Sequence, residues 1–334
     1  MKRVVVVGDG GWGTAMAIHL ARKGLEASIW SHDADYVRHL VEHRTNPRFL
    51  PGYPIPASVR VSASLAELLP GADLLVSAVP TEFLRAVWTR HASLLPAGLP
   101  ILSLTKGVEQ QTLLRPTQIL AEVTGDRPLA VMSGPNIAWE VAKGWPAASV
   151  AAGTEKGLVA SIREHVSSAT FRVYSNADMA GVELGGALKN VIALAAGVCD
   201  GLGLGHNAKA ALVTRGVIEI SRLGAALGGE RRTFFGLSGM GDLVTTCYSP
   251  TSRNRTFGER LGRGERAEDV IASMAQVAEG AKSAAPVHEL ALRHGLVLPI
   301  SEEVHRMLSD GREPKESVEA LMLRGKKDEA EDLM

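Results

Sequence analysis

The sequence predicts an α/β domain at the N-terminus and an all-α domain at the C-terminus. A continuous β-branched run, Val4 to Val7, ends at a glycine-rich turn and precedes a helical periodicity, which is typical of a strand buried on both faces of a parallel sheet. Strand-like and helix-like segments alternate as far as residue 178, and only helical periodicities follow. The 334 residues also exceed the roughly 250 at which single cores stop growing. We therefore expect two domains.

The first half alternates short β-rich runs with amphipathic periodicities. We expect helices over residues 14–23, 33–43, 82–95 and 113–123, and strands over residues 4–7, 27–30, 59–61, 73–79, 101–104, 129–132, 147–151 and 171–174. Because helices separate successive strands, a sheet with crossover connections is the expected arrangement.

The second half carries alanine and glycine at helical spacing. We expect helices over residues 182–199, 208–227, 253–261, 267–274, 281–294 and 300–309. The change of pattern places the domain boundary near residue 178, so that residues 1–178 form one domain and residues 179–325 the other. Residues 326–334, at the charge-alternating end of the chain, are expected to be a solvated tail.

Composition excludes several classes of protein. Apolar residues make up 46% of the chain, which excludes a disordered protein, and the 36 Lys and Arg balance the 36 Asp and Glu, which argues against a nucleic-acid binder. Cys199 and Cys247 are far apart, with no Cys or His at ligand spacing, so neither a disulfide framework nor a metal site is expected. The sequence shows no signal peptide and no apolar run of about 18 residues. A soluble, cytoplasmic protein is the expectation.

The glycine-rich turn has a specific spacing. Gly8, Gly10 and Gly13 form G-x-G-x-x-G directly after a strand and before a helix. At this spacing the first glycine allows a tight turn, the second lets the backbone approach a pyrophosphate, and the third lets helix and strand pack closely. The turn therefore predicts a Rossmann-type dinucleotide-binding domain, and no Gly-Lys-Ser/Thr follows that would indicate a Walker-type phosphate loop.

The residues after the second expected strand bear on which dinucleotide binds. Such folds place an acid here to bind a free ribose 2′-hydroxyl, or a neutral or basic group to tolerate a 2′-phosphate. Ser31 and His32, with help from Arg38, would suit the phosphate, and NADPH is then used at least as well as NADH. Asp33 would be the ribose acid if the strand ran further, and a plain helix cap at Ser31 or Asp33 is equally open.

A lysine and an asparagine interrupt the apolar pattern of residues 182–199. The side chain of Lys189 would be buried at a cost unless its ammonium is paired or its pKa is tuned downward, which proton transfer near neutral pH would require. A lysine whose stem lies along the helix while its head reaches water is the alternative.

Polar clusters elsewhere suit a small phosphorylated substrate. They contain lysine, aspartate and arginine beside glycine-rich turns, which can pair with a phosphate, although the arginines could simply cap or solvate a helix. Two of these clusters follow expected strands, at residues 105–107 and 133–136. Two more are expected in a loop, at residues 239–242 and 245–247, and the last is at residues 252–255.

Six motifs together resemble the bacterial type of NAD(P)-dependent glycerol-3-phosphate dehydrogenase, in order over roughly residues 1 to 325. They are Gly8-Asp9-Gly10-Gly11-Trp12-Gly13-Thr14-Ala15, Leu104-Thr105-Lys106-Gly107, Ser133-Gly134-Pro135-Asn136-Ile137-Ala138, Glu183-Leu184-Gly185-Gly186-Ala187-Leu188-Lys189-Asn190, Gly239-Met240-Gly241-Asp242-Leu243 and Ser252-Arg253-Asn254-Arg255. The resemblance implies a metal-free hydride transfer that interconverts sn-glycerol 3-phosphate and dihydroxyacetone phosphate with NADP or NAD, and it implies a role in making phospholipids.

The resemblance also implies roles for individual residues. Lys189 matches the proton donor and acceptor, and Asp242 supports its site. Expected cofactor contacts are Gly8, Gly10, Gly11, Trp12, Gly13, Ser31, His32, Lys106, Asn136, Ala138, Arg253, Val277 and Glu279. Expected substrate contacts are Lys106, Gly134, Asn136, Lys189, Asp242, Ser252, Arg253 and Asn254.

Two departures and two alternatives stand beside this resemblance. Gly11 replaces a common Ser or Ala, and His32 replaces a common Arg, which leaves the cofactor preference open.

A related two-domain dehydrogenase acting on a hydroxy acid or imine is one alternative, although an imine needs no phosphate-binding arginine. A dinucleotide-sensing protein without catalysis is the other, and it would need no lysine at position 189. A homodimer is compatible with the sequence, which does not decide the oligomeric state.

Overall fold

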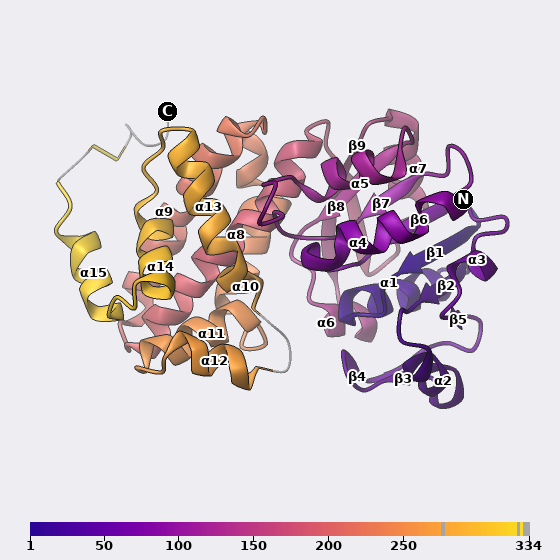
Figure 1. The fold of residues 1–334 in the computed structure, drawn as a ribbon, viewed down its shortest axis with the longest axis horizontal. Coiled ribbons are helices and arrows are strands. Elements are labelled where there is room, and N and C mark those ends of the chain that lie inside the picture. Colours follow the sequence, from indigo (N-terminus) through magenta and orange to yellow (C-terminus); the bar gives the residue numbers. More distant parts are fainter. Residues whose placement is uncertain (275–277, 326–327, 330–334) are drawn as a thin grey trace. The chain divides into compact units, whose positions relative to one another are not determined.

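The computed structural model describes residues 1–274, 278–325 and 328–329, and it divides into two compact units (Figure 1). The first unit comprises Met1–Lys106 and Leu114–Glu183, and the second comprises Gly107–Leu113 and Leu184–Met334. The chain passes from one unit to the other inside a long helix, at Glu183 and Leu184.

The first unit is built on an eight-stranded sheet with the order β10-β9-β8-β7-β6-β1-β2-β5. Val4 and Val6 of β1 belong to one hydrophobic core and Val5 and Val7 to another, which confirms that this strand is buried on both faces. The strands are β1 (Arg3–Val7), β2 (Glu26–Trp30), β5 (Arg60–Ser62), β6 (Leu74–Ser77), β7 (Ile101–Ser103), β8 (Leu129–Ser133), β9 (Ala147–Gly153) and β10 (Phe171–Ser175).

The strand order reverses beside β1. From β1 the chain moves to β2 and β5 on one side, and then returns to β6 on the other side of β1. Open α/β sheets bind ligands at the carboxyl ends of strands at such a switch point, so the end of β1 is where a ligand is expected. The helices of this unit are α1 (Gly11–Arg22), α2 (Ala34–His43), α3 (Leu65–Leu68), α4 (Thr81–His91), α5 (Pro116–Thr124), α6 (Ala138–Lys143) and α7 (Lys156–Val166).

The sheet differs from the expected one at β9. All neighbouring strands are parallel except β8 and β9, which are antiparallel. The connection between them carries only the short helix α6, and an antiparallel neighbour needs no crossover. A small antiparallel pair of strands, β3 (Thr45–Asn46) and β4 (Leu50–Pro54), and the helices α3, α6 and α7 were also not expected from the sequence.

The helix expected over residues 113–123 begins later, at Pro116. Leu113 has a positive φ of 61°, which a helix does not allow. Arg115 is extended because a residue before proline avoids the helical region, and Pro116 then occupies the first helical position, where its missing N–H does no harm.

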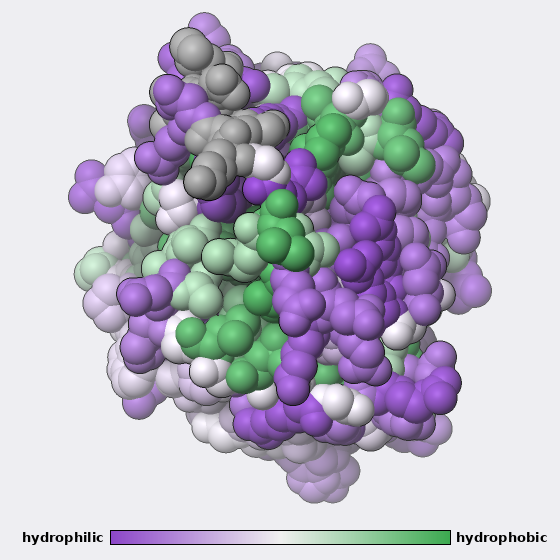
Figure 2. Space-filling model, turned by 90° about the vertical axis from the view of Figure 1, so that its left-hand side faces the viewer, coloured by the Kyte–Doolittle hydropathy of each residue, from purple (hydrophilic) through white to green (hydrophobic). Residues whose placement is uncertain are grey.

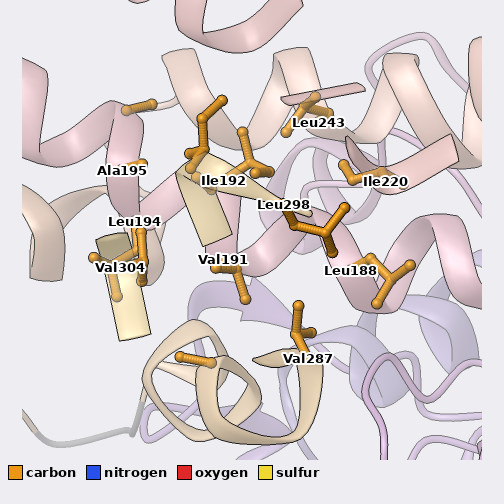
Figure 3. Packing of buried hydrophobic residues seen from close by; sticks show 14 of the residues in the cluster. Leu188, Val191, Ile192, Leu194, Ala195, Ile220, Leu243, Val287, Leu298 and Val304 are labelled. Atoms are coloured by element: carbon orange, nitrogen blue, oxygen red, sulfur yellow. The ribbon is translucent and has the colours of Figure 1, made fainter. Parts of the chain in front are cut away.

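The second unit is helical, as expected, and its core surrounds α8. Figure 3 shows Leu188, Val191 and Leu194 among apolar side chains from the helices packed around them. Two short turns, a 3-10 segment at Arg231–Phe235 and a π-helical turn at Leu237–Gly241, precede α10. The helices are α8 (Met179–Gly201), α9 (Gly205–Ala226), α10 (Asp242–Tyr248), α11 (Arg253–Gly262), α12 (Ala267–Ser273), α13 (Glu279–Arg293), α14 (Pro299–Ser309) and α15 (Pro314–Met322).

The loop expected over residues 239–247 is wrong, because this segment is the end of the π-helical turn followed by α10. Helix α15 was also not expected. By length and composition α8 could cross a membrane, but the whole of its apolar window is buried inside the protein, where it serves as a core helix.

Close backbone packing joins α8 to α11. A Cβ atom at Gly197 would lie 2.0 Å from the carbonyl oxygen of Arg255, and one at Gly258 would lie 1.9 Å from the carbonyl oxygen of Leu194. Both distances are far below van der Waals contact, so glycine is needed on each helix. This packing holds α11 against the C-terminal half of α8.

Several large apolar side chains of the second unit are exposed. Figure 2 shows apolar surface between hydrophilic regions on the side that this unit presents. Met322 and Leu323, at the end of α15, are 80% and 84% exposed, and Leu292 of α13 is 66% exposed.

A buried carboxylate caps a helix across the second unit. Glu219 of α9 accepts hydrogen bonds from the backbone N–H groups of Ile300 (2.6 Å) and Ser301 (3.0 Å) and from the Ser301 hydroxyl, in the first turn of α14. Burial raises the pKa of Glu219 to about 7, against the lowering effect of these hydrogen bonds. The folded protein therefore holds a proton here that the unfolded chain releases above its ordinary pKa of 4.5.

We expect the contribution of Glu219 to stability to fall as the pH rises from about 4.5 to 7, by an amount on the order of 3 kcal/mol. Over this range the folded state binds more protons than the unfolded state, so the free energy of unfolding falls as the pH rises. The full stabilisation from the raised pKa is present only below the pKa of the unfolded chain. Urea unfolding of the wild type and of Glu219→Gln at pH 4.5, 6 and 7.5 measures it. The difference in the free energy of unfolding between the wild type and this non-titrating variant should become smaller as the pH rises. A difference that does not change with pH would contradict the assignment.

Candidate active site

The glycine turn lies at the carboxyl end of β1, at the switch point of the sheet. Gly8 has a φ of 118°, and a Cβ atom there would lie 2.8 Å from the carbonyl oxygen of Ala78. A Cβ at Gly13 would lie 2.2 Å from the carbonyl oxygen of Gly8. A Cβ at Gly10, in contrast, would meet no protein atom within 4 Å. Gly8 and Gly13 are thus required by the fold, whereas Gly10 keeps the space in front of the turn open, as a pyrophosphate would need.

The end of β3 and the segment that follows it pack against this turn. Asn46 Nδ2 donates to the carbonyl oxygen of Asp9 and to Thr14 Oγ1, both at 2.7 Å. A Cβ at Gly11 would lie 2.6 Å from the carbonyl oxygen of Phe49. The glycine at position 11 is therefore explained by the close approach of Phe49, for which any larger residue would need a shift.

Strand β2 ends at Trp30, and the next three side chains have different environments. Ser31 is fully buried and its hydroxyl donates to Asp9 Oδ2 at 2.9 Å, whereas His32 is exposed. Asp33 caps α2 by accepting from the backbone N–H of Tyr36, and it pairs with Arg48 at 3.0 Å. Asp33 thus has the role of a helix cap. Burial raises the pKa of the Asp9 carboxyl, and the Ser31 hydrogen bond partly offsets this.

Lys106 and the 133–136 motif meet at the ends of β7 and β8. Lys106 Nζ donates to the carbonyl oxygen of Gly134 at 3.2 Å. Asn136 Nδ2 donates to the carbonyl oxygen of Ala148, and the Ser149 hydroxyl donates to Asn136 Oδ1, both at 3.0 Å. Ala138 begins α6, and its Cβ lies 3.8 Å from the position of a Cβ at Gly11. The first unit therefore gathers these predicted residues at the carboxyl edge of its sheet.

Lys189 is buried in the middle of α8 and is held by α10. Its Nζ donates to Asp242 Oδ1 at 2.8 Å and to Thr246 Oγ1, and only 7% of its side chain is exposed. The Thr246 hydroxyl in turn donates to the backbone carbonyl of Asp242 at 2.7 Å. Lys189 is therefore a paired, buried cation rather than a lysine whose head reaches open water, and its ammonium is fixed in direction by two acceptors.

A second polar chain starts at the neighbour of Lys189. Asn254 Nδ2 donates to Asn190 Oδ1 at 2.9 Å, and the backbone N–H of Gly280 donates to Asn254 Oδ1 at 2.8 Å. Asn190 Nδ2 lies 3.4 Å from Glu279 Oε2 as a donor. These contacts join α8, the start of α11 and the start of α13. Val277, a predicted cofactor contact, lies outside the described residues.

The arginine motif at the start of α11 has divided roles. The Ser252 hydroxyl caps α11 by accepting from the backbone N–H of Arg255. Arg255 pairs with Asp200 at 2.6 Å and with Glu259 at 3.1 Å, so its guanidinium is structural. Arg253 is exposed in the first turn of the same helix. Of the two arginines, Arg253 is therefore the exposed one.

Sequence reasoning did not predict the roles of three residues in these networks. Thr246 belongs to the polar cluster at residues 245–247, but its contact with Lys189 was not expected, because a loop does not predict that Asp242 and Thr246 stand four residues apart on one face of α10. Asp9 and Asn46 gave no signal, because only tertiary packing brings them to Ser31 and to the glycine turn. Within the described residues, no group of three or more His, Cys, Asp or Glu side chains could hold a metal ion.

Comparison with known proteins agrees with this arrangement. Residues 3–159 match the family described as NAD-dependent glycerol-3-phosphate dehydrogenase N-terminus, and residues 178–319 match its C-terminus. A glycerol-3-phosphate dehydrogenase [NAD(P)+] from Koribacter versatilis is 46% identical over 97% of this chain and 98% of its own length. One from Geobacillus thermodenitrificans is 44% identical over 100% and 98%.

A solved structure agrees as well. The crystal structure of glycerol-3-phosphate dehydrogenase from Coxiella burnetii superposes with a TM-score of 0.92 at 39% identity, over 97% of this chain and 99% of that one. These matches support this family, and not the related hydroxy-acid or imine dehydrogenases, over nearly the full length. The chain therefore belongs to the NAD-dependent glycerol-3-phosphate dehydrogenase family.

Proposed function

We propose that this protein interconverts sn-glycerol 3-phosphate and dihydroxyacetone phosphate with NAD(P). The observation that carries the proposal is the buried ammonium of Lys189, held by Asp242 and Thr246 on a helix of a chain that belongs to this family. In the cell the reaction would supply glycerol 3-phosphate for phospholipid synthesis in the cytoplasm, by a protein that could act as a homodimer.

The glycine turn of the first unit is assigned to the cofactor. The open space at Gly10 and the tight turn at Gly8 and Gly13 fit a pyrophosphate. Ser31 and His32, at the end of β2, are assigned to the adenosine ribose. Further proposed contacts are Gly11, Trp12, Lys106, Asn136, Ala138, Arg253, Val277 and Glu279. When bound, the nicotinamide supplies or accepts the hydride at C2 of the substrate.

Lys189 is assigned the proton. In the reductive direction its ammonium donates a proton to the C2 carbonyl oxygen, which becomes the hydroxyl, and in the oxidative direction the neutral amine takes that proton back. Before the proton moves, the positive charge stabilises the oxygen as it gains negative charge. Asp242 and Thr246 are positioning residues, because they hold Nζ in one direction and compensate its buried charge.

The remaining polar residues are assigned to the substrate. Lys106 and Arg253 carry positive charges that suit a phosphate dianion, and Asn254 is held rigidly by Asn190 and Gly280. Gly134, Asn136, Asp242 and Ser252 complete the proposed substrate contacts.

A direct assay tests the proposal. Dihydroxyacetone phosphate should cause oxidation of NADH or NADPH, which is measured as the loss of the absorbance band of the reduced nicotinamide. Unphosphorylated dihydroxyacetone should be a very poor substrate, since it lacks the group that the cationic residues recognise. A protein that binds the cofactor but oxidises it with neither compound would contradict the proposed reaction.

We expect Arg253→Ala to raise the KM for dihydroxyacetone phosphate by about tenfold or more, and by more than it weakens the cofactor. The guanidinium is exposed at the start of α11 and would pair with the substrate phosphate. Arg255→Ala is the matched comparison, because it removes a structural guanidinium from the same helix and should lower stability instead. Equal losses of kcat/KM with phosphorylated and unphosphorylated substrate would assign Arg253 to structure or to the cofactor.

A further inference from the structure

We propose that the Asp9 carboxylate, held by Ser31, makes this enzyme prefer a dinucleotide with a free adenosine ribose 2′-hydroxyl over one with a 2′-phosphate. The inference rests on the proposed function, because it concerns the same cofactor. It reverses the preference expected from Ser31 and His32 in the sequence alone.

Asp9 brings an acid to the place where dinucleotide folds contact the adenosine ribose. In such folds the residue that contacts the 2′ position lies at the carboxyl end of the second strand. Here that position holds Ser31, and the acid comes from the glycine turn: Asp9 Oδ2 lies 2.9 Å from Ser31 Oγ, while Gly8 N–H donates to the carbonyl oxygen of Trp30 at 3.0 Å. The turn and the end of β2 are thus joined both by backbone and by side chains.

The carboxylate is held in place by its surroundings. Asp9 is 7% exposed, its backbone carbonyl accepts from Thr14 Oγ1 at 2.9 Å, and Asn46 Nδ2 donates to the same oxygen at 2.7 Å. These two hydrogen bonds fix the backbone of Asp9, and burial together with the Ser31 hydrogen bond limits the movement of its side chain. Nothing in the turn itself needs an acid at this position, since the tight geometry depends on Gly8 and Gly13.

The other acid nearby is already engaged. Asp33 caps α2 through the Tyr36 N–H at 2.9 Å and pairs with Arg48 at 3.0 Å, so its charge is compensated. The Asp9 carboxylate accepts from the neutral hydroxyl of Ser31, and within the described residues it forms no ion pair. A carboxylate accepts several hydrogen bonds, so a ribose hydroxyl can add one, whereas a 2′-phosphate offers no donor and brings like charge into a partly dehydrated place.

The test measures binding without catalysis. Isothermal titration calorimetry compares ADP-ribose with 2′-phospho-ADP-ribose on the full-length wild type, Asp9→Asn and Asp33→Asn, with circular dichroism as the check on folding. We expect the wild type to bind ADP-ribose at least about tenfold more tightly, which is the scale of one unfavourable charge contact. Asp9→Asn keeps the shape of the side chain and an acceptor for Ser31. In this variant the ratio of the two dissociation constants should fall about tenfold, mainly because 2′-phospho-ADP-ribose binds more tightly. Asp33→Asn should leave the ratio of the two dissociation constants within about threefold of the wild-type ratio.

Each other outcome has one meaning. A wild type that binds both compounds equally, or prefers 2′-phospho-ADP-ribose, overturns the inference without touching the proposed function. So does an unchanged ratio in Asp9→Asn, or a narrowed ratio in Asp33→Asn, which would make Asp33 the reading acid. Should Asp9→Asn not fold, Asp9→Ser gives the same comparison with a smaller neutral side chain, and the wild-type ratio still decides. If neither compound binds the wild type, the proposed cofactor use fails as a whole.

Discussion

Lys189→Ala should lower kcat for the reduction of dihydroxyacetone phosphate by at least about a hundredfold, the usual contribution of a general acid or base. The variant loses the ammonium that we propose as the proton donor, while the glycine turn that we propose as the cofactor site is unchanged. Steady-state kinetics and titration with the reduced cofactor separate the two effects, and we expect the dissociation constant of the cofactor to stay within about threefold. Activity within about tenfold of wild type would remove Lys189 from the mechanism.

Two further variants separate catalysis from stability. Lys189→Ala leaves the buried Asp242 carboxylate without its cation, which should lower the free energy of unfolding by roughly 3 kcal/mol or more. The double variant Lys189→Met with Asp242→Asn removes both charges, so it should recover stability while remaining inactive. Lys189→Arg should also be inactive, because a guanidinium does not give up its proton near neutral pH. Activity in the stable double variant would show that the pair serves folding alone.

Gly13→Ala and Gly10→Ala should fail in different ways. At Gly13 the new methyl group would lie 2.2 Å from the carbonyl oxygen of Gly8, so helix α1 and strand β1 must separate, and we expect a loss of roughly 3 kcal/mol or more in unfolding free energy. At Gly10 the methyl group would meet no protein atom within 4 Å, and the φ of −57° is allowed for alanine. Gly10→Ala should therefore fold normally but bind NADH at least about tenfold more weakly.

Chemical denaturation and fluorescence titration with NADH check both variants. The contrast between them is the prediction: stability is lost at position 13 and affinity at position 10. Normal NADH affinity in a folded Gly10→Ala protein would mean that the pyrophosphate does not approach the backbone there. Wild-type stability of Gly13→Ala would contradict the close packing of α1 on β1.

Local patterns predicted most of the elements, for identifiable reasons. The continuous β-branched run at Val4–Val7 and the helical periodicity around Lys189 are strong signals, and their burial follows from residue type alone. The elements that were missed carry weak or conflicting signals. The strand β4 contains Pro51 and Pro54, which are unusual in strands, and α10 begins in a glycine-rich stretch that is typical of loops.

By itself the sequence determined the α/β and all-α halves and the glycine turn, because these depend on neighbours along the chain, but it left open whether the head of Lys189 is paired or reaches water. Only the tertiary structure decided which group pairs with which: Asp242 and Thr246 with Lys189, Asn254 with Asn190, and Asp9 with Ser31. These partners stand between 22 and 64 residues apart in the sequence. Hydrogen bonds and ion pairs act over about 3 Å, so their partners are set by how helices and strands pack, which no local pattern records.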